Sequence, residues 1–411
     1  MSAAKLTRAV MVAAALSLAL GACAANTNTG STNTSSGPSG SVSLPVVTDI
    51  PVPSDAANPA GDGKAVCSGV SLAYAGTQSV NNAQLGINIL DGVKTAVNAH
   101  NAANPGCQVA LKTFDTEGDP NKAPGVVNSL VSQKDIIGTV GLAFSGESEA
   151  ANNIFQSAGL PHITPSATNP SLTTQGYNTF FRGLANDNVQ GPAAASLMTS
   201  KLGAKSVCVI QDDSAYGIGL ATATIKALGS ADNANCNDKV TTGQKDFGST
   251  VSKVTNAKAG AVFYSGYYTE AAPLDQQLVN QGYTGPFVAP DGAKDPEFIK
   301  LAGGASKNAY FTCACIDGSL IPSFSTAYEK VSNGVAPGTY SVEGYDSATI
   351  LLKGIDAKNT TRSALLSYVK GYSADGLSKH FQWNATGELA VSTIYAYEVK
   401  NGAIVYAGTI S

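Results

Sequence analysis

From about residue 70 onward, short apolar runs alternate with segments in which apolar residues recur at every fourth position. The runs 70–74 and 109–114 predict buried strands. Between them, the fourfold spacing within 85–97 predicts a helix that ends near Asn104. This alternation of strand and helix is typical of a parallel sheet with helices on both faces.

The alternation forms two successive series. The first continues with predicted strands at 136–143 and 161–164. After Arg182 the pattern restarts, and the second series predicts a helix from Tyr216 and strands at 206–211, 261–264, 287–289 and 310–315. Two such series predict an α/β protein with two doubly wound parallel-sheet lobes.

The C-terminal part of the chain has a different pattern. Residues 341–355 and 362–370 predict helices, whereas 392–399 and 404–410 predict strands. The triplet Lys400-Asn401-Gly402 between these strands is a strong hairpin signal, because Asn and Gly tolerate the positive φ angles of a tight turn. We therefore expect the chain to finish in a hairpin.

The first 22 residues have the pattern of an export signal. Lys5 and Arg8 precede an apolar segment, 9–20, that is too short to span a bilayer, and small residues stand directly before Cys23. This arrangement resembles the lipobox of bacterial lipoproteins, in which the cysteine is lipidated and becomes the N-terminus. It implies a signal peptide over 1–22 and an exported chain anchored to the outer face of the cytoplasmic membrane through Cys23. An ordinary signal peptide is the alternative.

The segment after this signal is polar. Residues 24–65 are rich in Asn, Thr, Ser, Gly and Pro and show almost no apolar periodicity. Such a segment cannot bury enough surface to offset chain entropy. Together with Cys23 it predicts a disordered tether over 23–65, and the rest of the chain, from about residue 66, is long enough for two lobes.

Composition and motifs narrow the class of function. With 43% hydrophobic residues, 13% charged residues and a net charge of −4, the chain has a globular composition without a basic stripe, so we expect no nucleic-acid partner. The sequence contains no Gly-x-Ser-x-Gly elbow, no phosphate loop and no spaced His/Cys cluster. We therefore expect neither enzyme activity nor a cofactor or metal.

Six cysteines remain when Cys23 is set aside, and an even number in an exported protein favours disulfides. Cys67 and Cys107 stand near the starts of two predicted strands, on either side of one helix. Cys208 and Cys236 are placed similarly in the second series. Both pairings fit this pattern, although the sequence alone does not fix them.

Cys313 and Cys315 lie two positions apart and share one face of a predicted strand. Their Cα atoms would lie near the upper limit for a bridge. We expect a strained disulfide, with two free thiols as the alternative; a zinc site is not expected because no histidine lies nearby.

A binding site is expected at the carboxyl ends of the predicted strands, where open parallel sheets bind ligands. In the first series the loops there are 144–148 and 164–168, which offer hydroxyl groups and a helix N-terminus. In the second series the loops at 212–217, 264–268 and 290–292 offer tyrosines and a carboxylate. These groups match an α-amino acid, whose carboxylate needs donors and whose ammonium needs an anion and an aromatic face. Splitting the two ends between lobes would let the ligand hold the lobes closed.

Nearly all of the chain from Cys67 onward resembles the leucine/isoleucine/valine-binding proteins, the type I substrate-binding components of ABC transporters. The resemblance rests on stretches in family order and spacing, at residues 83–86, 115–123, 163–168, 182, 190–192, 216–219, 245–247, 264–270 and 290–292. It implies a type I periplasmic-binding-protein fold, with lobes joined by three crossings near Gly183, Ile316 and Thr393.

The resemblance also implies the lobe boundaries and the ligand contacts of the first lobe. That lobe would comprise residues 66–183 plus 317–392, and the second lobe residues 184–316 plus 393–411. In the first lobe, Ser145 and Thr168 would bind a ligand carboxylate, while Ser166 and Ala167 would contribute backbone groups. Without the resemblance, these residues are equally suited to turns and helix caps.

In the second lobe, the resemblance implies three contacts. Tyr216 would close over the ligand, Tyr267 (or alternatively Tyr264) would contact its ammonium, and Asp291 would pair with that group. The family position of Asp291 is often Glu. The structural alternatives are core packing for Tyr216 and a solvated turn for Asp291.

The sequence departs from the family in places that bear on ligand choice. An aromatic wall residue of the family is replaced by Leu85, which fits an aliphatic ligand, and a family disulfide is absent because its positions hold Gly118 and Phe144. The loop also carries Glu147 and Glu149 where the family commonly has uncharged residues.

An inward Glu147 would favour a basic or polar ligand. We interpret Glu147 and Glu149 as solvated residues in the first turn of a helix that starts near Ser148.

These features together predict a monomeric, lipid-anchored amino-acid-binding protein that delivers its ligand, branched-chain or related, to an ABC permease in the membrane. One alternative is a ligand sensor that uses the same pocket and acts on a signalling partner. A second, less favoured alternative is a secreted hydrolase that uses Ser145 as its nucleophile.

Overall fold

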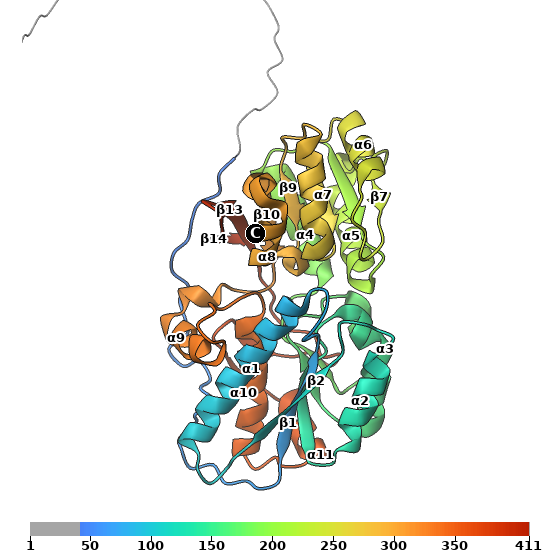
Figure 1. Cartoon of the computed structure of the whole chain (residues 1–411). Helices are drawn as coiled ribbons and strands as arrows, with labels where there is room; N and C mark the ends of the chain where they lie inside the picture. The colour runs from blue at the N-terminus through green and yellow to red at the C-terminus, as the bar shows by residue number, and fades with distance from the viewer. Residues whose placement is uncertain (1–41, 411) are drawn as a thin grey trace, which may run out of the picture. The chain divides into compact units, whose positions relative to one another are not determined.

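The structure, a computed structural model, describes residues 42–410 (Figure 1). The predicted signal peptide, Cys23 and the first part of the predicted tether lie outside the described residues. Within 42–410, no helix is long and apolar enough to cross a membrane. Two large sheets organise this part of the chain, one in the lower half of Figure 1 and one in the upper half.

The first sheet is parallel and, among the described residues, has five strands in the order β2-β1-β3-β4-β5. Its central strands are buried along their whole length, whereas the edge strand β2 is partly exposed. The strands are β1 (Ser71–Gly76), β2 (Ala110–Asp115), β3 (Ile136–Gly141), β4 (His162–Thr164) and β5 (Phe180–Arg182).

Helices cover both faces of this sheet because alternate residues of its strands point to opposite sides. Leu72 of β1 packs in an apolar cluster with Ile89 of α1, whereas its neighbour Ala73 packs in a second cluster with Val127 of α2 and Phe155 of α3. The helices beside this sheet are α1 (Ala83–Ala103), α2 (Ala123–Ser132), α3 (Ser145–Ala158), α10 (Ser341–Asp356) and α11 (Arg362–Lys370). Three further elements complete this region: α9 (Pro322–Val331), β11 (Ser373–Asp375) and β12 (His380–Gln382).

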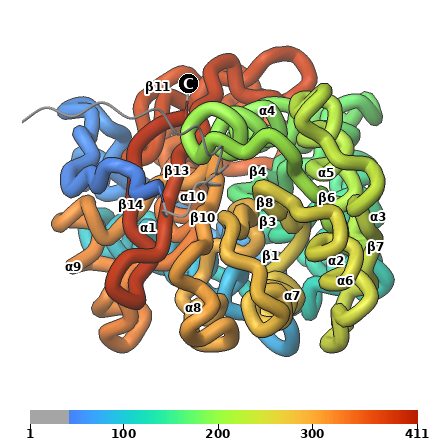
Figure 2. The backbone as a smooth tube through the Cα atoms, turned by 90° about the horizontal axis from the view of Figure 1, so that it is seen from above, coloured from blue at the N-terminus to red at the C-terminus, as the bar shows by residue number. Residues whose placement is uncertain are grey.

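The second sheet has the order β14-β13-β10-β9-β8-β6-β7 in the described part of the chain, and Figure 2 shows this succession across the molecule. Its strands are β6 (Val207–Gln211), β7 (Asp238–Lys239), β8 (Ala261–Ser265), β9 (Phe287–Ala289), β10 (Ala309–Cys313), β13 (Ile394–Lys400) and β14 (Ala403–Ile410). The strands from β6 to β10 are parallel, but β13 runs antiparallel to β10. The expectation of parallel sheets is therefore correct except at the edge of the second sheet formed by β13 and β14.

The second sheet also carries helices, and its last two strands form the predicted hairpin. The helices are α4 (Asp187–Ser196), α5 (Ala215–Leu228), α6 (Gly248–Asn256), α7 (Tyr268–Asn280) and α8 (Pro296–Ala302). At the hairpin turn, Asn401 and Gly402 have φ angles of 53° and 77°. Two successive positive φ angles give the turn whose twist matches that of the flanking strands. The hairpin prediction is therefore confirmed.

Part of the expected tether is ordered against the edge of the second sheet and the end of α1. We call residues 42–65 the N-terminal strap; it is the blue segment beside β13, β14 and α9 in Figure 1. The Val47 N–H donates to the Tyr406 carbonyl on β14 at 3.0 Å, and the Ala65 N–H donates to Asn104 Oδ1 after α1 at 3.1 Å. The expectation of disorder over these residues is wrong, because backbone groups of the strap pair with the edge of a sheet and with a helix end.

Three disulfides occur among the described residues: Cys67–Cys107, Cys208–Cys236 and Cys313–Cys315. The first links the segment between the strap and β1 to the turn between α1 and β2. The second links β6 to the loop before β7. The third lies at the carboxyl end of β10.

We expect the substitution of both Cys67 and Cys107 by Ser to lower the free energy of unfolding by about 4 kcal/mol, because the bridge closes a long loop and so restricts the unfolded chain. The sequence separation of this pair is 40 residues, against 2 for Cys313 and Cys315. The double substitution of Cys313 and Cys315 is the matched control and should cost far less. Urea titration followed by circular dichroism measures both, and equal losses would contradict the loop-length argument.

Candidate functional site

The loops at the carboxyl ends of the two sheets meet each other. The ring of Phe144, which follows β3, lies 4.7 Å from the ring of Tyr267, which follows β8. The Asn169 side chain, after β4, donates to the Ala215 carbonyl at the start of α5 at 2.7 Å. Candidate residues of both sheets are therefore buried at one shared interface.

On the side of the first sheet, Ser145 and Thr168 are buried but differ in their bonding. Ser145 is the first residue of α3, and its Oγ accepts the Asn169 backbone N–H at 3.2 Å. Thr168 Oγ1 is fully buried and has no hydrogen-bond partner among the described residues. The helix begins at Ser145, so its predicted start near Ser148 is wrong by three residues.

The backbone groups of the loop after β4 are largely occupied within the first lobe. The Ala167 N–H donates to Thr164 Oγ1 at 2.9 Å, and its carbonyl accepts the Arg182 guanidinium. The Ser166 hydroxyl donates to the Ala143 carbonyl at 2.5 Å. These bonds fix the shape of the loop that carries Thr168.

On the side of the second sheet, Asp291 is the centre of a hydrogen-bonded group. Its Oδ1 accepts the Tyr216 hydroxyl and the Gln190 amide, the latter at 2.9 Å. Its Oδ2 is buried and has no partner in the described part of the chain. Burial raises the pKa of Asp291, while bonding to Tyr216 and Gln190 and the nearby Tyr340 hydroxyl oppose this rise.

Aromatic rings form one wall of this interface. The Tyr216 ring lies 5.2 Å from the ring of Tyr267, which in turn contacts Phe144. Tyr264, the alternative ammonium contact, is fully buried within β8, where burial and then Asp212 raise the pKa of its hydroxyl. Leu85 is fully buried in the same apolar cluster as Phe144 and Tyr267.

Asp187 and Tyr340 are buried here as well, and no sequence pattern indicated either residue. Asp187 is the first residue of α4, and both its carboxylate oxygens lack a partner within 42–410. Burial and then the charge of Asp291 raise the pKa of Asp187 to about 8. The adjacent Thr168 hydroxyl and the positive charge of Arg182 oppose this rise. Tyr340 precedes α10 with a φ of 68°, a left-handed conformation that its residue type does not predict.

Glu147 is fully buried, so its interpretation as a solvated residue is wrong, whereas Glu149 is exposed as expected. Glu147 Oε2 accepts the Phe144 backbone N–H at 2.7 Å, which caps the start of α3. Burial raises the pKa of Glu147 to about 7, partly opposed by Thr116 and the Phe144 N–H. The side chain therefore serves the first lobe as a helix cap.

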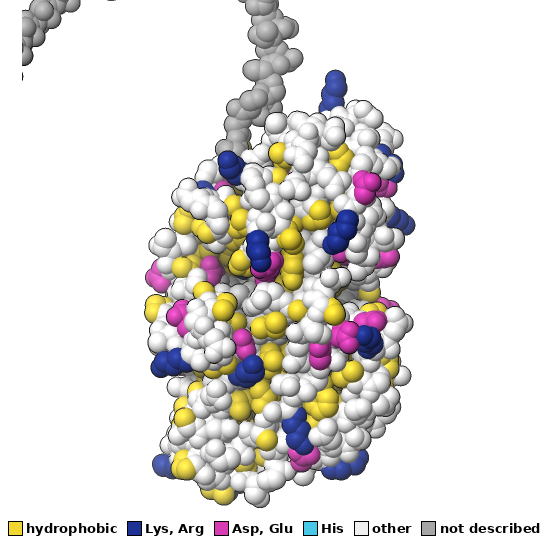
Figure 3. Space-filling view, viewed as in Figure 1, with side chains coloured by type: hydrophobic (Ala, Val, Ile, Leu, Met, Phe, Trp, Pro, Cys, Tyr) yellow, Lys and Arg dark blue, Asp and Glu magenta, His cyan; other side chains and the backbone are white. Residues whose placement is uncertain are grey.

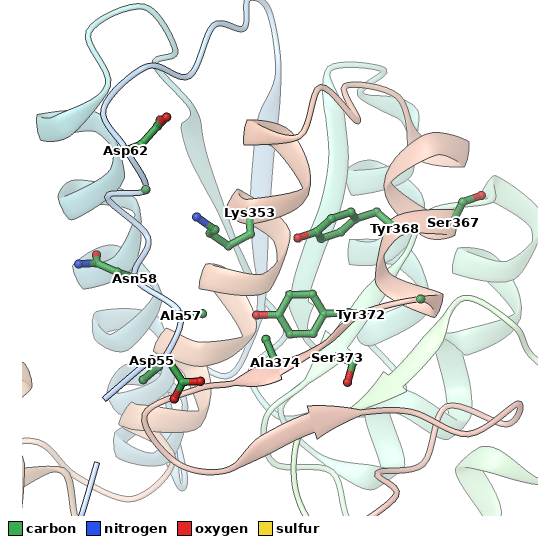
Figure 4. Close-up of a pocket in the computed structure, with 13 residues that line it drawn as sticks. Asp55, Ala57, Asn58, Asp62, Lys353, Ser367, Tyr368, Tyr372, Ser373 and Ala374 are labelled. Carbon is green, nitrogen blue, oxygen red and sulfur yellow. The ribbon is translucent and has the colours of Figure 1, made fainter. Parts of the chain in front are cut away.

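Surface features lie apart from this interface. A cavity of about 830 Å³ opens between the N-terminal strap and the helices α10 and α11, where Lys353, Tyr368 and Tyr372 line it (Figure 4). On the face drawn in Figure 3, Lys and Arg side chains are scattered among Asp and Glu. The binding residues predicted from the sequence are instead among those buried between the two sheets.

Comparison with known proteins identifies the family. A family model described as periplasmic binding protein matches residues 69–403. The chain belongs to this family. The amino acid binding protein of Pseudomonas aeruginosa is 32% identical to this periplasmic binding protein over 340 residues, which cover 80% of this chain and 90% of that protein. The Leu/Ile/Val-binding protein of Escherichia coli is 27% identical over 331 residues, which cover 79% of this chain and 89% of that protein.

Solved structures agree with the fold of this periplasmic binding protein. One is the branched-chain amino acid substrate-binding protein LivJ of Streptococcus pneumoniae, solved in complex with isoleucine. Its TM-score is 0.75 at 25% identity, and the match covers 82% of this chain and 99% of LivJ. The leucine-binding protein LivK of Thermotoga maritima has a TM-score of 0.74 at 25% identity, with 99% of it and 83% of this chain covered. The predicted type I fold of two α/β lobes is confirmed.

We expect Glu147→Ala to lower the free energy of unfolding by about 1–2 kcal/mol, because it removes the cap of α3 and leaves the buried Phe144 N–H without an acceptor. Glu149→Ala, two positions further along the same helix and exposed, should change it by less than about 0.5 kcal/mol. Urea denaturation compares the two variants. Equal stabilities would show that the Glu147 carboxylate contributes nothing as a cap.

Proposed function

We propose that this periplasmic binding protein binds an amino acid between its two lobes and delivers it to an ABC permease, without enzyme activity. The observation that carries the proposal is the pair of buried, unpartnered polar atoms on opposite sides of the interface, Thr168 Oγ1 and Asp291 Oδ2. A buried polar atom without a hydrogen bond costs about 1–3 kcal/mol. A solute that pairs with both atoms recovers this energy only when the lobes are together.

The chemistry on each side favours a zwitterion. The first turn of α3, which begins at Ser145, places backbone N–H groups and a positive helix end beside Thr168, as a carboxylate requires. Asp291, with the rings of Tyr216 and Tyr267, suits an ammonium group. Relatives named for amino acid, Leu/Ile/Val and leucine binding support the same ligand class.

The lobes in this proposal are those implied by the crossings near Gly183, Ile316 and Thr393. One comprises residues 66–183 plus 317–392 and carries the first sheet. The other comprises residues 184–316 plus 393–411 and carries the second sheet. The solute enters between them and holds them together by contacts that exist only in the closed form.

Attachment to the membrane completes the proposal. The small residues before Cys23 support cleavage and lipidation at that cysteine. A lipidated N-terminus on the outer face of the cytoplasmic membrane would keep the binding lobes close to the permease.

We expect Asp291→Asn to weaken binding of the preferred branched-chain amino acid by roughly 30-fold or more, because it removes the charge that pairs with the ammonium. Isothermal titration with L-leucine, L-isoleucine and L-valine measures the affinities, and thermal shift gives a second readout, since a ligand at a hundred times its Kd stabilises a protein by about 2.7 kcal/mol.

Asp49→Asn, which neutralises an exposed carboxylate on the strap, is the matched control and should bind as the wild-type protein does. Mass spectrometry should recover the amino acid unchanged. Wild-type affinity in Asp291→Asn, or no response of the wild-type protein to any amino acid, would refute the proposed function.

We expect Cys23→Ser to move the protein from the membrane fraction to the soluble fraction, because the acylated thiol is lost. Fractionation of the native host and labelling with a radioactive fatty acid measure this change. Cys313→Ser, which removes a cysteine far from the N-terminus, should leave the label in place. Retention of the label in Cys23→Ser would exclude anchoring at this residue.

A further inference from the structure

A side chain of the first sheet bonds directly to a helix of the second. The Asn169 amide, in the loop after β4, donates to the Ala215 carbonyl at 2.7 Å. Ala215 is the first residue of α5, the helix that follows β6. Figure 1 shows α5 above α3, so the bond lies where the two halves of the molecule meet. It connects protein groups only and belongs to none of the predicted ligand contacts.

Other bonds of Asn169 fix the direction of this amide. Its Oδ1 accepts the Ser171 N–H at 2.9 Å, which leaves Nδ2 to face α5. Its backbone N–H donates to Ser145 Oγ at 3.2 Å, and its carbonyl accepts the Arg182 guanidinium at 3.0 Å. Because the residue is already held by the first lobe, the bond to Ala215 costs little conformational entropy.

The absence of a side chain at Gly219 admits the amide to its acceptor. Gly219 lies one turn after Ala215, and a Cβ atom on it would lie 2.9 Å from Asn169 Nδ2 and 3.3 Å from Asn169 Cγ. A methyl group at this position would therefore displace the amide from the Ala215 carbonyl. Glycine is less favourable than alanine inside a helix, so Gly219 weakens α5 while it permits the contact.

Protein groups of the two sheets also meet elsewhere. Thr269 Oγ1, in the first turn of α7, lies 3.1 Å from Asn82 Oδ1, which follows β1. The rings of Phe144 and Tyr267 form a third contact. Contacts of this kind exist only while the lobes are together, so their free energy adds to that of any solute bound between them.

We propose that Asn169 is a positioning residue that latches the two lobes together through the Ala215 carbonyl and raises the affinity for every solute by one common factor. The inference rests on the proposed function, because it concerns a solute bound between the lobes. Apparent affinity scales with the population of the form that is competent to bind. Since the amide is committed to a protein carbonyl, it does not distinguish one solute from another.

Asn169→Asp disrupts this bond with the least other change. It keeps Oδ1 for the Ser171 N–H but replaces the donor by an oxygen that repels the Ala215 carbonyl. Isothermal titration and stopped-flow kinetics on the full chain compare L-leucine, L-isoleucine and L-valine. We expect all three to bind more weakly by the same factor, roughly 10-fold, mainly through faster dissociation. Asn178→Asp, the same change at an exposed position of the first lobe, is the matched control and should bind as the wild-type protein does.

Gly219→Ala separates the latch from charge and from stability. The added methyl group displaces the Asn169 amide without a change of charge, and alanine favours the helix. We expect the same common loss of affinity, with no decrease in the free energy of unfolding measured in urea. A merely structural role would lower that free energy instead. In the double variant the losses should not add, because both substitutions remove one bond.

Wild-type affinity in either variant, or losses that differ among the three amino acids, would overturn the inference. Gly219→Ala decides the matter if Asn169→Asp fails to fold. If no amino acid binds the wild-type protein, the proposed function fails, and hydrogen exchange of the three proteins without solute then tests the latch alone. Residues 264–268, which meet the first lobe at Phe144, should exchange faster in both variants than in the wild-type protein. Equal exchange would reject the latch.

Discussion

A buried carboxylate with one free oxygen is the constraint on which this protein depends. Asp291 is held on one side by Tyr216 and Gln190, and its other oxygen has no donor in the described structure. Burying such a group costs free energy that the lobe contacts alone must offset. In the proposed function, a solute that supplies the missing donor would stabilise the closed arrangement, so that binding and closure would be one event.

Arg182, a buried cation whose charge acts on the neighbouring Asp187, is committed to other groups. Arg182 is committed to Glu388 and to the carbonyls of Ala167 and Asn169, and its own carbonyl accepts the Trp383 indole at 2.7 Å. This network joins β5 to the loop after β4 and to the C-terminal part of the chain. It fixes the loop on either side of Thr168, because the Arg182 guanidinium binds the carbonyls of Ala167 and Asn169.

Local patterns predicted most of the fold, because they report properties that a segment carries by itself. The residues of α11 were predicted as 362–370, and the turn at Asn401 and Gly402 was predicted from its tolerance of positive φ. The antiparallel pairing of β13 and the docking of the strap depend on distant partners, and the sequence did not indicate them.

For the site, Tyr216, Tyr267 and Asp291 were chosen from loop position and resemblance, and the structure brings them together. Glu147 was misjudged because a capping box is recognised by Ser or Thr at its first position, and Phe144 stands there.

The N-terminal strap limits how far the two sheets can separate. It is bonded to β14 at Val47 and to the end of β11 at Ala57, whose N–H donates to the Asp375 carbonyl at 2.7 Å. Between these two points, Ile50 packs against the cluster that contains Ile316. The ten Cα-to-Cα steps from Val47 to Ala57 span at most about 36 Å when fully extended. The lobe opening that the proposed function requires would therefore have to stay within the length of this segment or break a backbone bond at one of its ends.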